Sequence, residues 1–228
     1  MMPPIELKSH IVAFIDLLGF SAMVVQDCET PNGEQKFIES LYECHVETKN
    51  LKKDHPDLQL IQFSDSVVFA LPYSIDNYIT LIVVIANYQY NLLSKGILCR
   101  GGISYGKHFS TEDFLFSHGM IEAYRLESRI AVTPRVVISK ELLDLVKPDI
   151  DKKSVDLPIT LENDGLLFIN YITGRNAQEV WSHVAKIIPF ELSESPSIRN
   201  KQVWLIEFYN HTYPDTKQKV IDKFSKEP

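Results

Sequence analysis

The sequence predicts an α+β fold with the order β-α-β-β-α-β, the ferredoxin-like plan, around an antiparallel-rich central sheet. Three observations support this prediction. An apolar run at 10–16 ends in a carboxylate, as a buried central strand does where chemistry sits at its exit. Two β-rich runs, 58–63 and 67–71, are separated by only three short polar residues. Segments with helical spacing of apolar residues lie between the strands.

The first half of the chain supplies a strand, a helix and a hairpin. Gly19 allows the chain to turn sharply after the first strand. Apolar residues recur at helical spacing over 34–51, which predicts an amphipathic helix. The polar residues 64–66 (SDS) predict a tight hairpin between the two β-rich runs.

The second half completes the plan and adds a C-terminal α/β extension. Asp76 is the predicted N-cap of a helix that ends near Gly96, and the glycine pair at 101–102 marks a bulge or a close backbone approach within the next strand. The elements predicted after that helix are a strand at 97–108, a helix at 117–130, a strand at 135–139, a short helix at 140–146, a hairpin at Gly165, a helix at 177–188 and a buried aromatic segment near Trp204.

Bulk properties predict one cytoplasmic domain over 1–228, with a core at about 8–140 and an extension at about 141–228. The net charge of −7 argues against nucleic acid or an acidic membrane as a partner. The N-terminus lacks the apolar core of a signal peptide, and the most hydrophobic stretch, 79–86, is too short to span a bilayer. The three cysteines are isolated, as expected in a reducing compartment.

Asp16 and Asp65 are the candidate chemical residues. One ends the first strand and the other lies in the turn of the central hairpin, two points that are adjacent in this topology. Adjacent carboxylates repel each other unless a cation lies between them, and Mg²⁺ or Mn²⁺ prefers such hard oxygen ligands. The alternative is that each side chain only satisfies backbone groups of its own turn.

Several motifs together resemble class III nucleotidyl cyclases. Residues 14–20 (FIDLLGF) resemble the first metal motif of that family, and 63–66 (FSDS) its second metal-binding hairpin. Residues 100–106 (RGGISYG) resemble its Arg-x-Gly-Ile-x-x-Gly strand, while 123–128 (AYRLES) and 134–139 (PRVVIS) resemble its closing helix and strand. The order and spacing match over about residues 10–140.

The resemblance implies a homodimer with active sites at the subunit interface and two Mn²⁺ or Mg²⁺ ions in each site. It implies that Asp16, Asp65 and the backbone carbonyl of Leu17 hold the ions. Gly19 and Phe20 would offer backbone N–H groups to the phosphates of a nucleoside triphosphate.

The resemblance also implies that Arg125 reaches across the subunit interface and stabilises the charge of the transition state. A surface ion pair with Glu122 is the alternative for this side chain. Arg100 and Arg129 are its substitutes, and Arg100 is either a substrate-binding residue or a structural residue of its strand.

Two departures from the family concern the base. Ile61 stands where adenylyl cyclases carry Lys and guanylyl-type enzymes Glu, and Ile121 stands where an Asn steadies the ribose. Loss of these hydrogen-bonding groups argues against an ordinary purine cyclase. The two isoleucines either shape the base pocket or simply pack in the core.

With these substitutions and the segment 201–210 (KQVWLIEFYN), the chain resembles bacterial Pycsar pyrimidine cyclases. The resemblance implies a phosphorus–oxygen lyase that converts UTP or CTP to a 3′,5′-cyclic monophosphate and pyrophosphate. The product would act on a separate effector protein in antiphage defence. Two alternatives remain open: an adenylyl or guanylyl cyclase with an altered base pocket, and an inactive cyclase fold that serves as a binding or dimerisation module.

Overall fold

A computed structural model describes residues 5–111, 114–188 and 192–219. Residues 1–4, on which the signal-peptide prediction partly rests, lie outside the described residues. The elements, in chain order, are β1 (Lys8–Leu17), α1 (Phe20–Glu29), α2 (Phe37–Asn50), a 3₁₀ turn (Leu51–Lys53), β2 (Gln59–Phe63), β3 (Ser66–Pro72), α3 (Ile75–Ser94), β4 (Cys99–Ser110), β5 (Leu115–Ser117), α4 (His118–Arg129), β6 (Val136–Ile138), α5 (Lys140–Lys153), β7 (Ile159–Leu161), β8 (Leu167–Ile169), α6 (Ala177–Ile187), α7 (Pro196–Thr212) and a second 3₁₀ turn (Pro214–Thr216).

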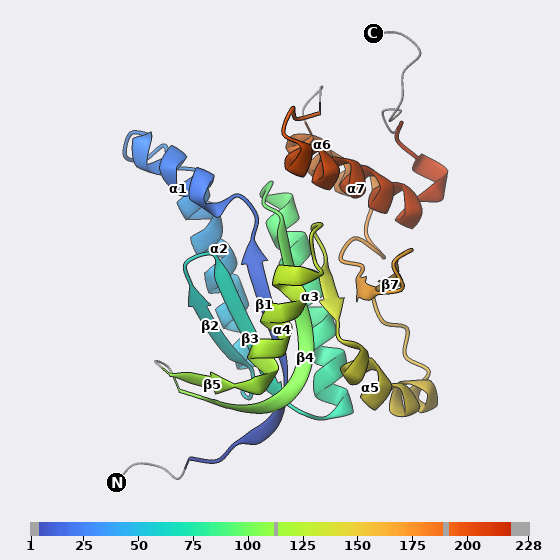
Figure 1. The fold of residues 1–228 in the computed structure, drawn as a ribbon. Helices are drawn as coiled ribbons and strands as arrows, with labels where there is room; N and C mark the ends of the chain where they lie inside the picture. The colour runs from blue at the N-terminus through green and yellow to red at the C-terminus, as the bar shows by residue number, and fades with distance from the viewer. Residues whose placement is uncertain (1–4, 112–113, 189–191, 220–228) are drawn as a thin grey trace.

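The strands form one sheet in the order β2-β3-β1-β4-β6-β8-β7, and β5 pairs with β4 (Figure 1). The pairing is antiparallel throughout except between β4 and β6. The order β2-β3-β1-β4 is the sheet that a β-α-β-β-α-β chain forms, so the predicted α+β class and antiparallel-rich sheet are confirmed.

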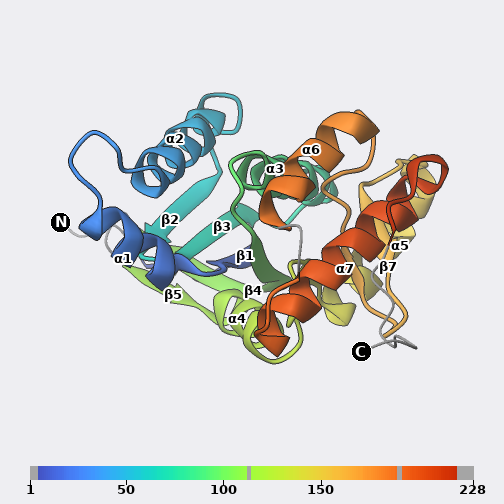
Figure 2. The same ribbon diagram turned by 90° about the horizontal axis from the view of Figure 1, so that it is seen from above.

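Helices cover both faces of the sheet. In the view from above, α2 and α3 lie on one side of the sheet and α4 on the other (Figure 2). Alternate residues of β1 face these two layers. Ile11 and Ile15 belong to the large core on the α3 side, while Phe14 packs in a smaller cluster with Ala123 of α4. By the same alternation Asp16 faces α4.

Glycines in β4 let α4 and β1 approach closely. A Cβ on Gly102 would lie 2.4 Å from the carbonyl oxygen of Ala123 in α4, and one on Gly101 would lie 2.4 Å from the carbonyl oxygen of Phe14 in β1. The predicted close backbone approach is therefore confirmed. It fixes α4 directly over the strands that carry Asp16 and Arg100.

Some predicted boundaries were wrong. The N-cap of α3 is Ser74, whose side chain accepts a hydrogen bond from the Asn77 backbone at 3.1 Å, so Asp76 lies inside the first turn. Helix α5 continues through Pro148 to Lys153, beyond the predicted end at 146. The C-terminal aromatic segment forms the helix α7.

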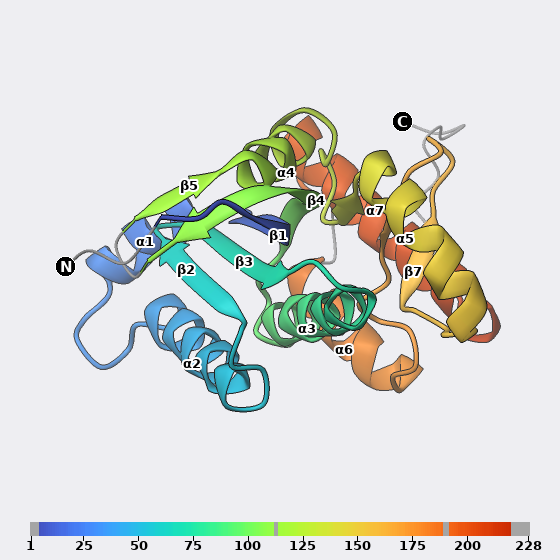
Figure 3. The same cartoon turned by 90° about the horizontal axis from the view of Figure 1, so that it is seen from below.

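The C-terminal extension continues the sheet through β8 and β7. The view from below shows β7 beside α5 and α7 (Figure 3). Gly165, with φ of 82°, turns the predicted hairpin between these strands. Arg135, 3% exposed, pairs with Glu162 and Asp164 of this hairpin, and Trp204 of α7 donates to Glu162 at 2.8 Å. The single-domain assignment stays a prediction. Across the described parts of the chain, every helix is too short or too polar to cross a membrane.

Candidate active site

The two predicted metal aspartates meet at one edge of the sheet. Asp16 pairs with Ser66 near the end of β1, and Asp65 lies in the two-residue turn between β2 and β3. Ser64 makes this turn possible by adopting a positive φ of 55°. The backbone N–H of Leu17 donates to the carbonyl oxygen of Asp65 at 2.9 Å, so the turn is tied to the end of β1. The two aspartates therefore lie side by side, as the topology predicted.

Arg100 links Asp16 to a carboxylate on α4. It is the cross-strand partner of Asp16 on β4, and its Nε lies 3.3 Å from Asp16 Oδ2. Its Nη2 lies 2.7 Å from Oε1 of Glu127. The Glu127 side chain is 3% exposed, against 20% for that of Asp16. One guanidinium is thus shared between a strand carboxylate and a deeply buried helix carboxylate.

This cluster holds more negative than positive charge. Burial raises the pKa of Asp16; Arg100 opposes this rise and the charge of Asp65 adds to it. Burial likewise raises the pKa of Glu127, again with Arg100 opposing and both aspartates adding. Three carboxylates therefore act on one another around a single arginine, an environment that a divalent cation would relieve.

The start of α1 adjoins the aspartates and suits an anion. Gly19, with φ of 79°, turns the chain directly from β1 into α1, which begins at Phe20. No side chain caps this helix start. The first backbone N–H groups of a helix lack intrahelical partners and point along the positive end of its dipole. They are therefore available to a phosphate, and the role predicted for Gly19 and Phe20 in binding one stays a prediction.

The oxygen donors fit Mg²⁺ or Mn²⁺, which prefer hard ligands. Within 5–111, 114–188 and 192–219, no cluster of three or more His, Cys, Asp or Glu side chains forms a metal site. Asp16 and Asp65 would therefore need further oxygens from backbone, such as the Leu17 carbonyl, and from substrate. Sites of this composition are usual for Mg²⁺ bound to phosphates, and the local excess of negative charge also favours a cation.

The other predicted arginines lie elsewhere on α4. Arg125 is half exposed and forms an ion pair with Glu122, the alternative considered for it. Arg125 and Arg129 line a cavity of about 430 Å³ between α4, β4 and the start of α5. Among the described residues, the arginine that contacts Asp16 is Arg100. Within one subunit, Arg100 rather than Arg125 contacts Asp16.

The two isoleucines differ in their surroundings. Ile61 is partly buried and packs against the small cluster between the sheet and α4. Ile121 on α4 is 47% exposed, so the idea that both residues simply pack in the core is wrong for Ile121. Their role in a base pocket stays a prediction.

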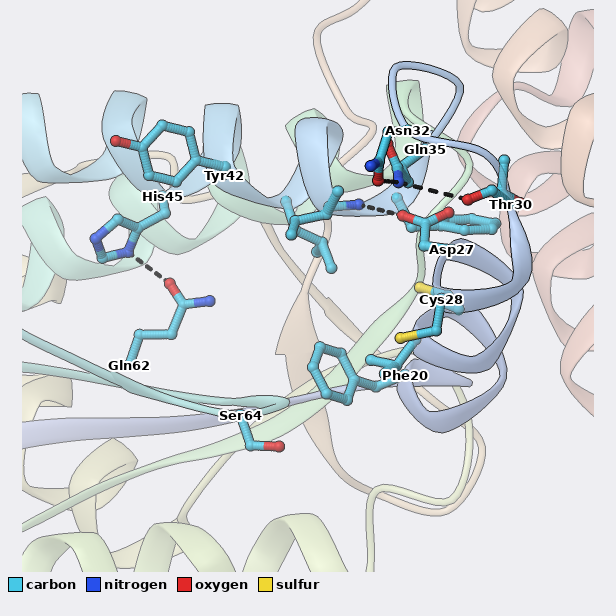
Figure 4. A pocket seen from close by; sticks show the side chains of 15 residues that line it. Phe20, Asp27, Cys28, Thr30, Asn32, Gln35, Tyr42, His45, Gln62 and Ser64 are labelled. Carbon is cyan, nitrogen blue, oxygen red and sulfur yellow. Dashed lines mark hydrogen bonds between the residues drawn. The ribbon is translucent and has the colours of Figure 1, made fainter.

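A cavity of about 850 Å³ lies between α1, α2 and the end of β2 (Figure 4). Phe20 and Ser64 line it, so it borders both the start of α1 and the turn that holds Asp65. His45 and Gln62 also line the cavity, and His45 Nδ1 lies 2.5 Å from Gln62 Oε1 (Figure 4). The buried Asp27 accepts a hydrogen bond from the Ile38 backbone at 2.7 Å and so fixes the loop between the two helices.

The role of Glu127 was missed by sequence reasoning. It lies in the motif at 123–128, four residues after the buried Ala123 and hence on the same helix face. That spacing is the signal that could have placed it against the sheet.

No protein-family model matches the chain, and no curated protein sequence matches it. Similar solved structures are cyclase domains. The adenylate cyclase of Trypanosoma brucei in its monomeric state has 12% identity and a TM-score of 0.51, covering 74% of this chain and 92% of that chain. The adenylyl cyclase CyaB from P. aeruginosa has 15% identity and a TM-score of 0.49, covering 72% and 94%. The guanylyl cyclase domain of RhGC from Catenaria anguillulae, solved in complex with GTP, has 18% identity and a TM-score of 0.46, covering 74% and 98%. The similarity to the Trypanosoma brucei enzyme shows that the chain has the fold of a nucleotidyl cyclase domain.

Proposed function

We propose that this chain is a pyrimidine nucleotide cyclase that converts UTP or CTP to the 3′,5′-cyclic monophosphate and pyrophosphate, using Mn²⁺ or Mg²⁺. The observation that carries the proposal is the pairing of Asp16 and Asp65 at the end of β1, in a fold shared with a nucleotidyl cyclase domain. Two acidic side chains and an uncapped helix start would meet the metal and phosphate needs of this reaction.

The reaction forms one bond and breaks one. The ribose 3′-oxygen attacks the α-phosphorus, the bond to pyrophosphate breaks, and the hydroxyl proton passes to solvent. Bound divalent ions would lower the pKa of that hydroxyl and neutralise the leaving pyrophosphate. Asp16 and Asp65 would hold the ions, and the first N–H groups of α1 would orient the phosphates. Arg125 of the partner subunit would stabilise charge in the transition state.

Exposed apolar side chains support a homodimer. Ile121 and Tyr124 on α4 are 47% and 49% exposed, Phe116 on β5 is 60% exposed, and Phe63 at the end of β2 is 80% exposed. Tyr124 also packs edge-on against Phe14 of β1, with ring centroids 5.4 Å apart. Aromatic and aliphatic surfaces of this kind are enriched at protein interfaces. A dimer through this face would place Arg125 close to the second subunit.

The pyrimidine assignment rests on the two positions that read the base in purine cyclases. Ile61 and Ile121 offer no hydrogen bond there, and Ile121 is accessible at the surface of α4. A site without the matching polar groups loses its preference for adenine or guanine. We extend the proposal to a product that signals to a separate effector in antiphage (Pycsar) defence, on the sequence resemblance alone.

The test is incubation of the purified protein with each of the four NTPs and Mn²⁺, followed by separation of cyclic products. We expect cyclic UMP or cyclic CMP to dominate. Asp65→Asn should lower kcat about 100-fold or more, because one metal ligand loses its charge. Asp57→Asn, an exposed aspartate ahead of β2, is the matched control and should retain full activity.

Other products would change the assignment. Dominant cyclic AMP or cyclic GMP would show a purine cyclase with an altered base pocket. Failure of the protein to bind Mn²⁺ in calorimetry would indicate an inactive binding or dimerisation module. Full activity in Asp65→Asn would refute the metal role of Asp65.

A further inference from the structure

Arg100 lies beside Asp16, with its Nε 3.3 Å from Asp16 Oδ2, so its charge would oppose that of a metal ion bound by Asp16. We propose that Arg100 is the counter-cation of Asp16 in the metal-free protein, and that Glu127 is the positioning residue that draws Arg100 aside when a divalent ion binds. This inference rests on the proposed metal site. It adds a role for two residues that do not themselves need to contact the reacting atoms.

The two contacts of Arg100 are unequal. Asp16 Oδ2 accepts a hydrogen bond from Arg100 Nε at 3.3 Å. Glu127 Oε1 forms an ion pair with Nη2 at 2.7 Å but accepts no hydrogen bond from the described residues, and its side chain is the more buried of the two. A buried carboxylate with one cationic neighbour holds that neighbour strongly, because loss of the pair would leave an uncompensated charge. Because the buried Oε1 of Glu127 still lacks a hydrogen bond, it can accept one from the guanidinium when a metal ion displaces Arg100 from Asp16.

The backbone around Arg100 is fixed, so exchange would involve the side chain alone. Arg100 is paired with Asp16 across β1 and β4, and the next residue, Gly101, donates from its N–H to the Arg135 carbonyl at 3.0 Å. Gly101 also packs against the backbone of β1 too closely to admit a Cβ. Helix α4, which carries Glu127, is held equally closely against Gly102.

Electrostatics gives the direction of the exchange. A divalent ion at Asp16 and Asp65 would lie within a few ångströms of the Arg100 guanidinium, and like charges at that separation repel strongly near a protein surface. Glu127 offers the displaced guanidinium a carboxylate that it already contacts. Arg100 contacts two carboxylates, those of Asp16 and Glu127. Without Glu127, Arg100 would contact Asp16 alone and would compete more strongly with the metal ion for it.

The test is calorimetric titration of the nucleotide-free protein with Mn²⁺ at neutral pH. Arg100→Gln should bind Mn²⁺ about threefold to tenfold more tightly than the wild type, because a competing charge is gone. Glu127→Gln should bind it more weakly, and the effect of Glu127→Gln should shrink when Arg100 is already Gln. Lys107→Gln removes the same charge from an exposed site at the far end of β4, and should change the affinity less than about twofold.

The sign of the change separates competition from a structural role. A merely structural Arg100 would give weaker or unchanged Mn²⁺ binding in Arg100→Gln, and that result would overturn the inference. Should thermal melting show that Arg100→Gln is misfolded, the folded Glu127→Gln protein decides: weaker binding supports the inference, and equal or tighter binding refutes it. Absence of Mn²⁺ binding in the wild type would instead refute the proposed metal site itself.

Discussion

Substitution of Gly102 by Ala tests the close contact that places α4 over the site. The added Cβ would lie 2.4 Å from the Ala123 carbonyl oxygen and 2.5 Å from Leu126 Cβ. Ordinary van der Waals contact begins near 3.4 Å, so α4 must retreat by about 1 Å. Overpacking of this kind costs about 1–3 kcal/mol. For a chain of 228 residues, we expect the melting temperature to fall by about 3–10 °C.

The functional consequence of Gly102→Ala is a displaced α4. This helix carries Glu127, so its movement should weaken the contact with Arg100. Gly101→Ala is the matched control, since its Cβ would meet the Phe14 carbonyl oxygen of β1 at 2.4 Å and not α4. Both variants should lose stability in thermal and urea unfolding. A Gly102→Ala protein with unfolding free energy within about 0.5 kcal/mol of the wild type would refute the packing argument.

Three further predictions concern charge. Arg135→Met leaves Glu162 and Asp164 without their buried cation. Since both carboxylates are partly exposed, we expect the free energy of unfolding, measured in urea, to fall by about 2–4 kcal/mol. An unchanged free energy of unfolding would contradict the stabilising role of these ion pairs. Arg135 lowers the pKa of Asp164 below 3.8, so this carboxylate stabilises the fold above that pH, and the stabilisation is lost as the pH falls through the lowered value. The melting temperature of Asp164→Asn, measured at a series of acidic pH values, should therefore fall less steeply with pH than that of the wild type. Burial raises the pKa of Asp16, so the Mn²⁺ affinity measured by calorimetry should be halved at a pH above the ordinary aspartate value of 3.8 as acid is added, and halving at or below 3.8 would contradict this.

Local patterns in the sequence were enough to predict most elements. Each of these patterns consists of residues that are close together in the sequence: the apolar run of β1, the polar turn of the hairpin and the glycine pair of β4. Boundaries failed where a neighbouring side chain decided the outcome. Ser74 caps α3 in place of Asp76 because its oxygen reaches the N–H of Asn77, and short polar residues next to each other cannot be ranked from sequence.

The sequence by itself determined that one aspartate ends the first strand and another lies in the hairpin turn, because strand period and turn chemistry are local properties. Only the tertiary structure decided what surrounds Asp16. Arg100 is 84 residues away along the chain and reaches Asp16 through the register of β1 with β4. Glu127 reaches Arg100 because Gly102 lets α4 pack directly on the sheet. Such long-range contacts depend on strand register and helix packing together, and no local pattern encodes both.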